Sequence, residues 1–507
     1  MTVARLTPRP APRIAKMPTW GYGLITILAI LVVWQIAAQT VLRSSGTIPA
    51  PLDILGQFGR DGIGFYLTNA AVTALEALSG YLIGVGAAIG EPSGTAVVLA
   101  ALGEPSGTAV VLAALGVFFT TLVGALLGLS SVDPRSLEVV DAFGATRWTR
   151  LFRVQLFSAI PSIINALKIA APSAVLGAIL GEYVGGVDKG LGPALVSAQQ
   201  GMDVGRTWAL AITSAALAGA WFALMSLFAA IVNRLGWRSH LGAAPAAPPR
   251  SRTAGLKAIV GGVVSLVVIV AAWWGALVAF DVSPYVGKTP LQLWEYLVVA
   301  EEGPSRVAKL AGELLVTLQD AMIGFVAGLA IALVAAVLFQ LVPALQKGFM
   351  PIAILLQSVP LVAMAPVIIL VLGRGTATVA AMAGLIVFFP ALVNISSALK
   401  EAPAALTDLV QVYGAGRIKE VFIVRLPACL PALFASIRIA LPGAIAGALL
   451  AEWLATGKGL GYAIISSLGR GDNTQVWACV VLITAASLLL YAVAAQVERF
   501  VARRRGV

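Results

Sequence analysis

The sequence is poor in the residues that support catalysis or cross-linking. Charged residues make up 11% of its 507 residues, cysteine occurs twice and histidine once. Two cysteines, Cys429 and Cys479, are too few for a disulfide framework, and a metal site would need further ligands. His240 lies in a polar stretch, where we interpret it as a bystander. A disulfide-stapled domain and a catalytic metal centre are therefore disfavoured.

Apolar residues, by contrast, make up 59% of the chain. Soluble domains contain about 45–50% apolar and about 25% charged residues, so we expect lipid to be the solvent. Several apolar runs, such as 21–42 and 257–280, reach the roughly 20 residues that a helix needs to cross a bilayer. Apolar and polar residues do not alternate within these runs, as they would in the strands of a membrane barrel. The sequence therefore predicts an all-α polytopic membrane protein.

The net charge of +11 fits this prediction. Short basic clusters flank the apolar runs at both ends of the chain, as expected of cytoplasmic segments. No aromatic residues interleave with them to form a stacking platform, so we expect no nucleic-acid partner. The first apolar run is too long for the core of a signal peptide, and we interpret it as a retained membrane helix.

The chain contains an internal repeat of one sequence unit. The stretch that begins at Gly144 aligns without gaps with the stretch that begins at Gly414, and KGLG occurs at 189–192 and again at 458–461. A linker rich in proline, alanine and arginine separates the copies. We predict a cytoplasmic tail, a first unit, a cytoplasmic linker, a second unit and a basic tail at 1–20, 21–235, 236–256, 257–500 and 501–507.

Six helices are predicted in the second unit, at 257–280, 312–341, 350–373, 376–399, 431–455 and 476–500. Both ends of this unit and the loop around Asp408 are basic and are placed inside, while the acidic stretch 281–311 is placed outside. Both units share this orientation, which makes a parallel repeat. Five helices are clear in the first unit, so the expected total is about eleven.

The first unit is shortened near 90–115. Thirteen residues at 90–102 are repeated letter for letter at 103–115, and only the first copy stands where the second unit has the 39 residues 334–372. The helices at 71–90 and 107–129 should then both end inside, and 91–106 would have to recross the bilayer. A re-entrant hairpin, an inverted N-terminus, and a rearranged gene or sequence error are the open explanations.

Each unit carries one amphipathic loop between membrane helices. The loops read EVVDAFGATRWTRLFRVQLF at 138–157 and DLVQVYGAGRIKEVFIVRLP at 408–427. In both, a short helical stretch starts with an acidic residue and leads to a glycine that permits a sharp turn. A second stretch mixes basic and apolar residues. The pattern indicates either a helix lying on lipid headgroups or a helix pair that docks on a partner.

These loops resemble the EAA loop of ATP-binding-cassette importer permeases, and AEWLATGKGLGYAI at 451–464 resembles the nitrate/sulfonate/taurine branch. The resemblance covers most of the chain and implies two tandem type I importer permease units. It assigns coupling to an ATPase to Glu138, Gly144, Arg147, Asp408, Gly414 and Arg417. The sequence departs from the family pattern at three places. The alanine pair is replaced by Val139-Val140 and Leu409-Val410, the acid is Asp408 in the second copy, and the terminal proline is Phe157 in the first.

The resemblance also implies the partners. Two copies of an ABC ATPase would bind on the cytoplasmic side of a bacterial inner membrane and carry ATP and magnesium, and a soluble extracytoplasmic protein would deliver the substrate. We expect this chain to be a transport subunit without enzymatic activity, because it has no complete phosphate-binding loop. The expected substrate is a small solute such as nitrate, a sulfonate, taurine or a related organic compound. An ion-gradient-driven transporter of two fused halves is the alternative.

Ionisable and polar residues inside the predicted spans are candidates for the translocation pathway, because burying them in lipid is costly. Glu76 and Asp320 occupy equivalent positions in the two units, as do Glu182 and Glu452. A helix-packing contact for the first pair and an interfacial position for the second are the alternatives. Gln357 and Ser358 precede a stretch with two prolines, which indicates either a broken, pathway-lining helix or a structural kink.

Overall fold

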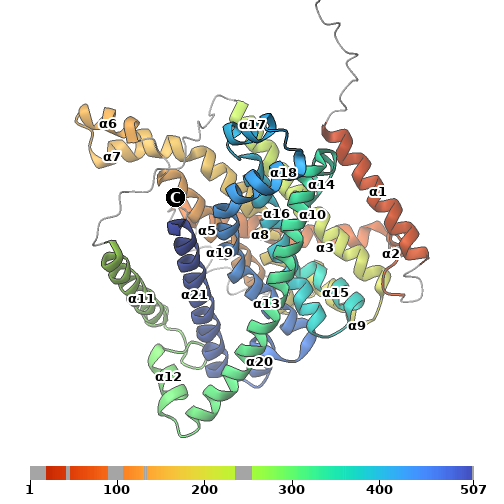
Figure 1. Cartoon of the computed structure of the whole chain (residues 1–507). Coiled ribbons are helices and arrows are strands. Elements are labelled where there is room, and N and C mark those ends of the chain that lie inside the picture. The colour runs from red at the N-terminus through yellow and green to blue at the C-terminus, as the bar shows by residue number, and fades with distance from the viewer. Residues whose placement is uncertain are drawn as a thin grey trace, which may run out of the picture.

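A computed structural model describes residues 19–40, 46–89, 107–130, 132, 134–234, 254–357, 359 and 361–504 (Figure 1). Within these ranges the chain is helical and contains no strand, which confirms the all-α class. Nine helices in the described part are long and apolar enough to cross a membrane. The total of about eleven spans stays a prediction.

The five helices predicted in the first unit are all present. They are α1 (Thr19–Gln39), α3 (Ile63–Ile89), α5 (Gly107–Ser130), α8 (Leu156–Gly185) and α10 (Val204–Arg234). Two shorter helices, α2 (Pro51–Asp61) and α9 (Leu191–Gln200), were not predicted. Residues 90–106, which hold most of the thirteen-residue repeat, lie outside the described residues.

The second unit differs from its prediction mainly where helices break or extend. Its elements are α11 (Ala254–Ala279), α12 (Pro290–Trp294), η2 (Glu295–Val299), α13 (Gly303–Leu341), α14 (Pro343–Gln357), α15 (Leu361–Leu372), α16 (Thr376–Lys400), α19 (Leu426–Ala451), η4 (Glu452–Thr456), α20 (Gly459–Gly469) and α21 (Asn473–Arg504). The single helix predicted at 350–373 is described as two helices, and the sequence between them contains Pro360, which has no amide hydrogen for a helical hydrogen bond.

Glycines bring equivalent helices into close contact in both units. A side chain at Gly80 or Gly84 of α3 would overlap the α5 backbone, and one at Gly324 or Gly328 of α13 would overlap α16. The order of these contacts along each pair shows that α3 runs parallel to α5, and α13 parallel to α16. The absence of Cβ atoms thus permits tight helix packing of the kind common in membranes. As predicted for 71–90 and 107–129, α3 and α5 therefore end on the same side.

The broken helix of the second unit packs into the first unit. Val362, Ala363 and Val367 of α15 belong to a buried apolar cluster with residues of α8 and α10. The equivalent groove of the second unit, between α19 and α21, is a cavity of about 370 Å³. Its lining includes Pro442, Ile445, Ile483 and Tyr491. The two units are therefore asymmetric at their seam, where only one of the two grooves holds a described helix.

A charged cluster fixes α2 against the start of α10. Two nitrogens of Arg206 contact Asp61, at 2.6 and 3.1 Å, and the Tyr66 hydroxyl donates to Asp61 at 2.6 Å. The Arg206 guanidinium, followed by the Tyr66 and Gln57 hydrogen bonds, holds the pKa of the Asp61 carboxyl well below its usual range. Because the folded pKa is lowered, the carboxylate stabilises the fold above its unfolded pKa, and this contribution is lost as the pH falls.

We therefore expect Asp61→Asn to lower the free energy of unfolding by about 1–2 kcal/mol at pH 7, the lower range for a charge-assisted contact that is partly exposed. The difference from the unsubstituted chain should shrink as the pH is lowered below about 4. Thermal unfolding in detergent at pH 7 and pH 3 measures both effects. Asp188→Asn, at an exposed position, serves as the control. An equal loss of stability at both pH values would contradict this account.

Candidate functional site

Both amphipathic loops lie on the same side of the helical body (Figure 1). The first contains α6 (Pro134–Ala142), α7 (Arg147–Arg150) and the π-helical turn η1 (Leu151–Gln155), which continues into α8. The second contains α17 (Ala404–Val412), α18 (Arg417–Glu420) and η3 (Val421–Arg425), which continues into α19. The two loops therefore repeat the same order of elements.

A left-handed glycine sets the turn in each loop. Gly144 has a φ of +73° and Gly414 a φ of +75°. The amide of each donates to the carbonyl three residues back, at 2.9 Å in both loops. The next amide, of Ala145 or Ala415, donates to the carbonyl five residues back, at 3.3 or 3.1 Å. Glycine is suited to this helix-ending geometry because it lacks the Cβ that makes positive φ costly.

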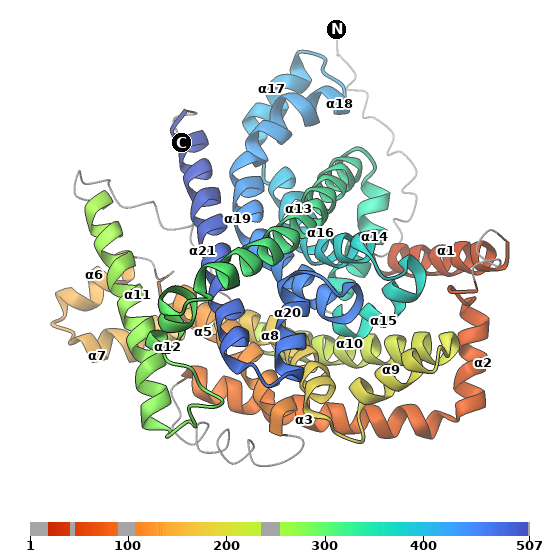
Figure 2. The same cartoon turned by 90° about the horizontal axis from the view of Figure 1, so that it is seen from below.

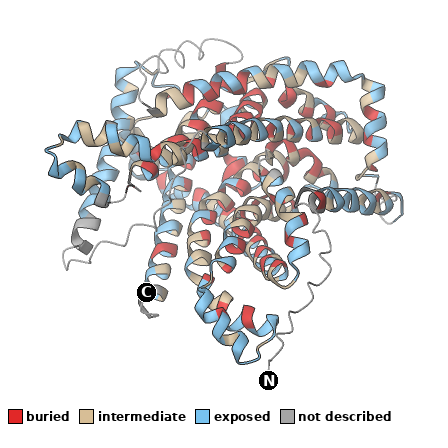
Figure 3. Cartoon of the chain, turned by 90° about the horizontal axis from the view of Figure 1, so that it is seen from above, coloured by how far each residue is buried: buried red, intermediate tan, exposed pale blue. Residues whose placement is uncertain are grey.

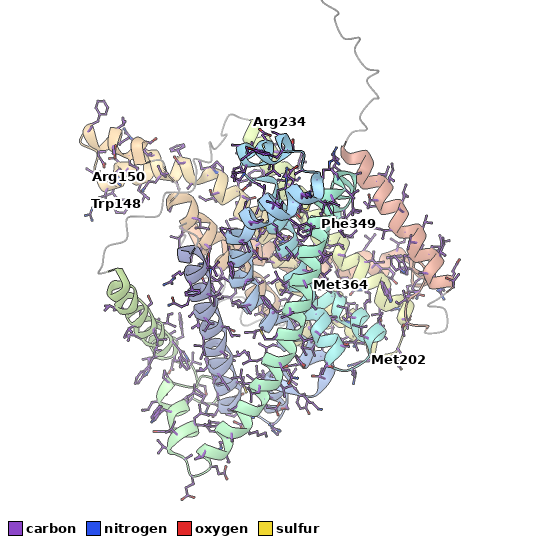
Figure 4. The ribbon with its side chains drawn as sticks, in the orientation of Figure 1. Trp148, Arg150, Met202, Arg234, Phe349 and Met364 are labelled. Carbon is purple, nitrogen blue, oxygen red and sulfur yellow. The ribbon has the colours of Figure 1, made fainter. Side chains whose placement is uncertain are left out.

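Equivalent apolar side chains project from both loops. Phe143 is 88% exposed and its counterpart Tyr413 is 84% exposed, while Trp148 and its counterpart Ile418 are 69% and 63% exposed. Trp148 points away from the helical body at the far end of its loop (Figure 4). Large apolar groups exposed at the same place in two copies indicate a contact surface. In the sequence, Phe143 and Tyr413 were assigned only to the ends of the short helical stretches. Aligning the two loops would have identified them as aromatic residues at equivalent positions.

The charged residues predicted to act in coupling are exposed. Glu138, Arg147, Asp408 and Arg417 all lie on the surface of their loops. In the described part of the chain, none of the four forms an ion pair. Their charges are therefore available to a partner.

Other polar residues brace the loops. In the first, Arg150 contacts Asp141 at 3.1 Å. In the second, the equivalent positions hold Glu420 and Gln411, joined at 3.0 Å. Glu420 also pairs with Arg425 at 2.6 Å, and Arg425 donates to the Leu399 carbonyl at the end of α16 at 3.0 Å. The second loop is thus tied to the membrane helices by an arginine that the first unit replaces with Gln155.

On the opposite side of the molecule, a carboxylate holds the KGLG turn in each unit. Glu182 is 1% exposed and accepts from the Thr73 hydroxyl at 2.5 Å and from the Gly192 amide at 2.7 Å. Thr73 in turn accepts from the Leu191 amide at 2.9 Å. These bonds fasten α9 to α3 and α8, so Glu182 satisfies backbone groups that burial would otherwise leave unpaired.

The second unit repeats this arrangement. Glu452 is completely buried and accepts from the Thr317 hydroxyl and from the Gly461 amide, both at 2.9 Å. The Leu460 amide donates to Thr317 at 2.9 Å. We call the two sets the first clamp (Thr73, Glu182 and Gly192) and the second clamp (Thr317, Glu452 and Gly461). Figure 2 shows α9 and α20, the helices they hold, on the face turned away from the loops.

The remaining pathway candidates are Glu76, Asp320, Gln357 and Ser358. Glu76 and Asp320 are both buried, and each lies three residues, about one helical turn, after the threonine of its clamp. In each unit the structure thus places one acid from each sequence pair, Glu76 with Glu182 and Asp320 with Glu452, on two helices that a clamp joins. Gln357 is exposed at the end of α14. Ser358 lies outside the described residues. The pathway role of all six residues stays a prediction.

Comparison with known proteins identifies the family. The sequence model of the binding-protein-dependent transport system inner membrane component matches residues 25–238 and again 325–507. The chain belongs to this family of transporter permeases. The two matched segments lie one in each unit, which shows the tandem arrangement.

Individual permeases align with about one unit each. A probable ABC transporter permease of Haemophilus influenzae is 32% identical over 35% of this chain and 72% of its own length. The riboflavin transport permease RibX of Chloroflexus aurantiacus is 33% identical over 31% of this chain and 59% of its own. The formylaminopyrimidine transport permease ThiX of Halalkalibacterium halodurans is 26% identical over 43% and 84%. Each of these permeases is thus similar to less than half of this chain.

Proposed function

We propose that this permease is the membrane-spanning subunit of an ATP-driven importer, in which both halves of the translocation machinery lie on one chain. The observation that carries the proposal is the pair of equivalent loops. Each has a left-handed glycine, exposed charges and an exposed aromatic residue at the same place. A loop that only rests on lipid headgroups would need no such turn. We infer that each loop docks on one of two ATPase subunits.

In this proposal the residues of each loop have different roles. Phe143 and Tyr413 insert into an apolar recess of the ATPase, and Glu138 and Asp408 pair with basic groups at its rim. Arg147 and Arg417 offer guanidinium groups for planar, bidentate contacts. Gly144 and Gly414 set the angle between the two short helices. ATP and magnesium bind the ATPase partner, and closure of the two ATPase subunits moves the two loops together.

The pathway is proposed to follow the seam between the units, across a bacterial inner membrane. An extracytoplasmic binding protein would deliver the solute. Glu76, Asp320, Glu182, Glu452, Gln357 and Ser358 are the proposed pathway or pathway-supporting residues. Similar permeases are named for riboflavin, formylaminopyrimidine, aliphatic sulfonates, taurine and nitrate. We propose a small solute of this range, such as nitrate, a sulfonate, taurine or a related organic compound.

The proposal is tested with liposomes that contain the chain, its ATPase and its binding protein. Uptake should require ATP, the ATPase and the binding protein together. Liposomes that hold the permease alone and a proton or sodium gradient are the comparison. Uptake by these would favour the ion-gradient alternative and contradict the importer.

The exposed aromatic residue of the second loop gives a sharper test. We expect Tyr413→Ser to weaken ATPase binding about tenfold or more, because a buried interface tyrosine contributes more than about 1 kcal/mol. Affinity is measured with purified permease and ATPase in detergent. Met202→Ser is the matched control, because Met202 is 77% exposed but lies away from the loops (Figure 4). Equal weakening by both substitutions would contradict a specific docking role for Tyr413.

A further inference from the structure

Two aromatic rings meet across the seam between the units. Tyr183, near the end of α8, and Trp453, in η4, lie edge to face with ring centroids 6.4 Å apart and planes at 81°. They occupy equivalent positions, because each directly follows the carboxylate of its own clamp. Both side chains are half-buried. The molecule therefore brings the same position of its two units into contact.

The backbone behind each ring is anchored. Glu182 and Glu452 are buried and bonded to the turn that follows them, at 2.7 Å through Gly192 and 2.9 Å through Gly461. Left-handed glycines, Gly186 with a φ of +64° and Gly457 with a φ of +69°, end both helical segments shortly after the rings. The backbone that carries each ring is thus anchored to its own unit, so a movement of one unit away from the other would separate the pair.

The contact lies next to the two clamps, on the side of the molecule away from the loops. Leu450, one turn before Trp453, packs against the buried clusters of both units. Figure 3 shows the buried residues, coloured red, in the interior of the helical body.

We propose that Tyr183 and Trp453 form the extracytoplasmic gate of the permease, closed in this structure, which the solute passes when the units separate. This inference rests on the proposed function. An edge-to-face pair suits the task because it excludes water when closed, yet it involves no buried ion pair that would hold the units together. The two clamps act as positioning groups that carry loop-driven movement of each unit to its ring.

The gate is tested by cross-linking in the assembled transporter. In membranes containing the ATPase, Tyr183→Cys/Trp453→Cys should be joined efficiently by a short bifunctional thiol reagent without nucleotide. ATP with vanadate, which traps the closed ATPase, should lower the yield about tenfold. The native Cys429 and Cys479 are buried, and the unsubstituted chain measures their background. Trp273→Cys/Trp477→Cys is the control, because those rings stack at 5.2 Å within the second unit, and its yield should not change.

Three outcomes would overturn the gate: no cross-link without nucleotide in a variant that still inserts, an unchanged yield after trapping, or a parallel change in the control pair. Uptake by the unsubstituted transporter, measured in the same preparation, reports on the proposed function separately. A second readout uses Tyr183→Phe and Tyr183→Ala. The ring-keeping variant should transport normally, whereas the alanine variant should hydrolyse ATP with at least about tenfold less solute moved per ATP. Equal behaviour of the two variants would also overturn the assignment.

Discussion

Replacing Gly414 with proline is expected to abolish ATP-driven uptake while the chain still accumulates in the membrane. Proline requires a φ near −65°, whereas Gly414 has a φ of +75°, and its amide donates to the Gln411 carbonyl at 2.9 Å. A conflict worth about 3 kcal/mol or more would lower ATPase affinity by at least about 100-fold. The measurements are uptake in liposomes and ATPase binding in detergent.

Two alanine variants control for this result. Gly414→Ala and Gly416→Ala both place a methyl group in open space, but Gly416 has an ordinary φ of −70°. We expect the first to reduce coupling through about 1–2 kcal/mol of left-handed strain. The second should reduce coupling less, because Gly416→Ala introduces no left-handed strain and loses only the preference of an N-cap for glycine over alanine. Normal uptake by Gly414→Pro would remove the turn from the coupling mechanism.

Replacing Gly459 with alanine should disrupt the second clamp and lower the amount of folded permease. Gly459 has a φ of +84°, and a Cβ there would overlap the buried carboxyl of Glu452. Left-handed strain and overpacking together predict a loss of about 2–5 kcal/mol. Thermal unfolding in detergent and the yield of folded chain from membranes measure this effect.

Gly457→Ala is the matched control for the clamp. Gly457 also has a positive φ, +69°, but nothing lies within 4 Å of its Cβ position. It should lose only the strain of about 1–2 kcal/mol. The difference between the two variants isolates the steric contact with Glu452. Similar losses in both would mean that the carboxylate yields easily, and that the clamp does not hold the turn.

The sequence predicted the elements that depend on local pattern. Membrane helices followed from apolar runs of sufficient length, and α11, α16 and α21 begin within about three residues of their predicted starts. The glycine turns at Gly144 and Gly414 followed from residue type, because few residues tolerate positive φ. The short helices α9 and α20 were not predicted. They contain only ten and eleven residues and lack the strong periodic pattern from which a helix is predicted.

The loops were identified from sequence because a repeated pattern of acid, glycine and basic residues is local and survives in both copies. What the sequence alone determined is therefore the membrane class, the duplication and the two amphipathic loops. The tertiary structure decided the rest. The pairing of Glu182 with Thr73 and of Tyr183 with Trp453 joins residues far apart in the chain, and such partners are selected by helix packing rather than by spacing. Likewise, only the packed structure shows that α15 fills the groove between α8 and α10, while the matching groove between α19 and α21 is a cavity. The difference depends on which helix faces meet, and sequence spacing does not determine this.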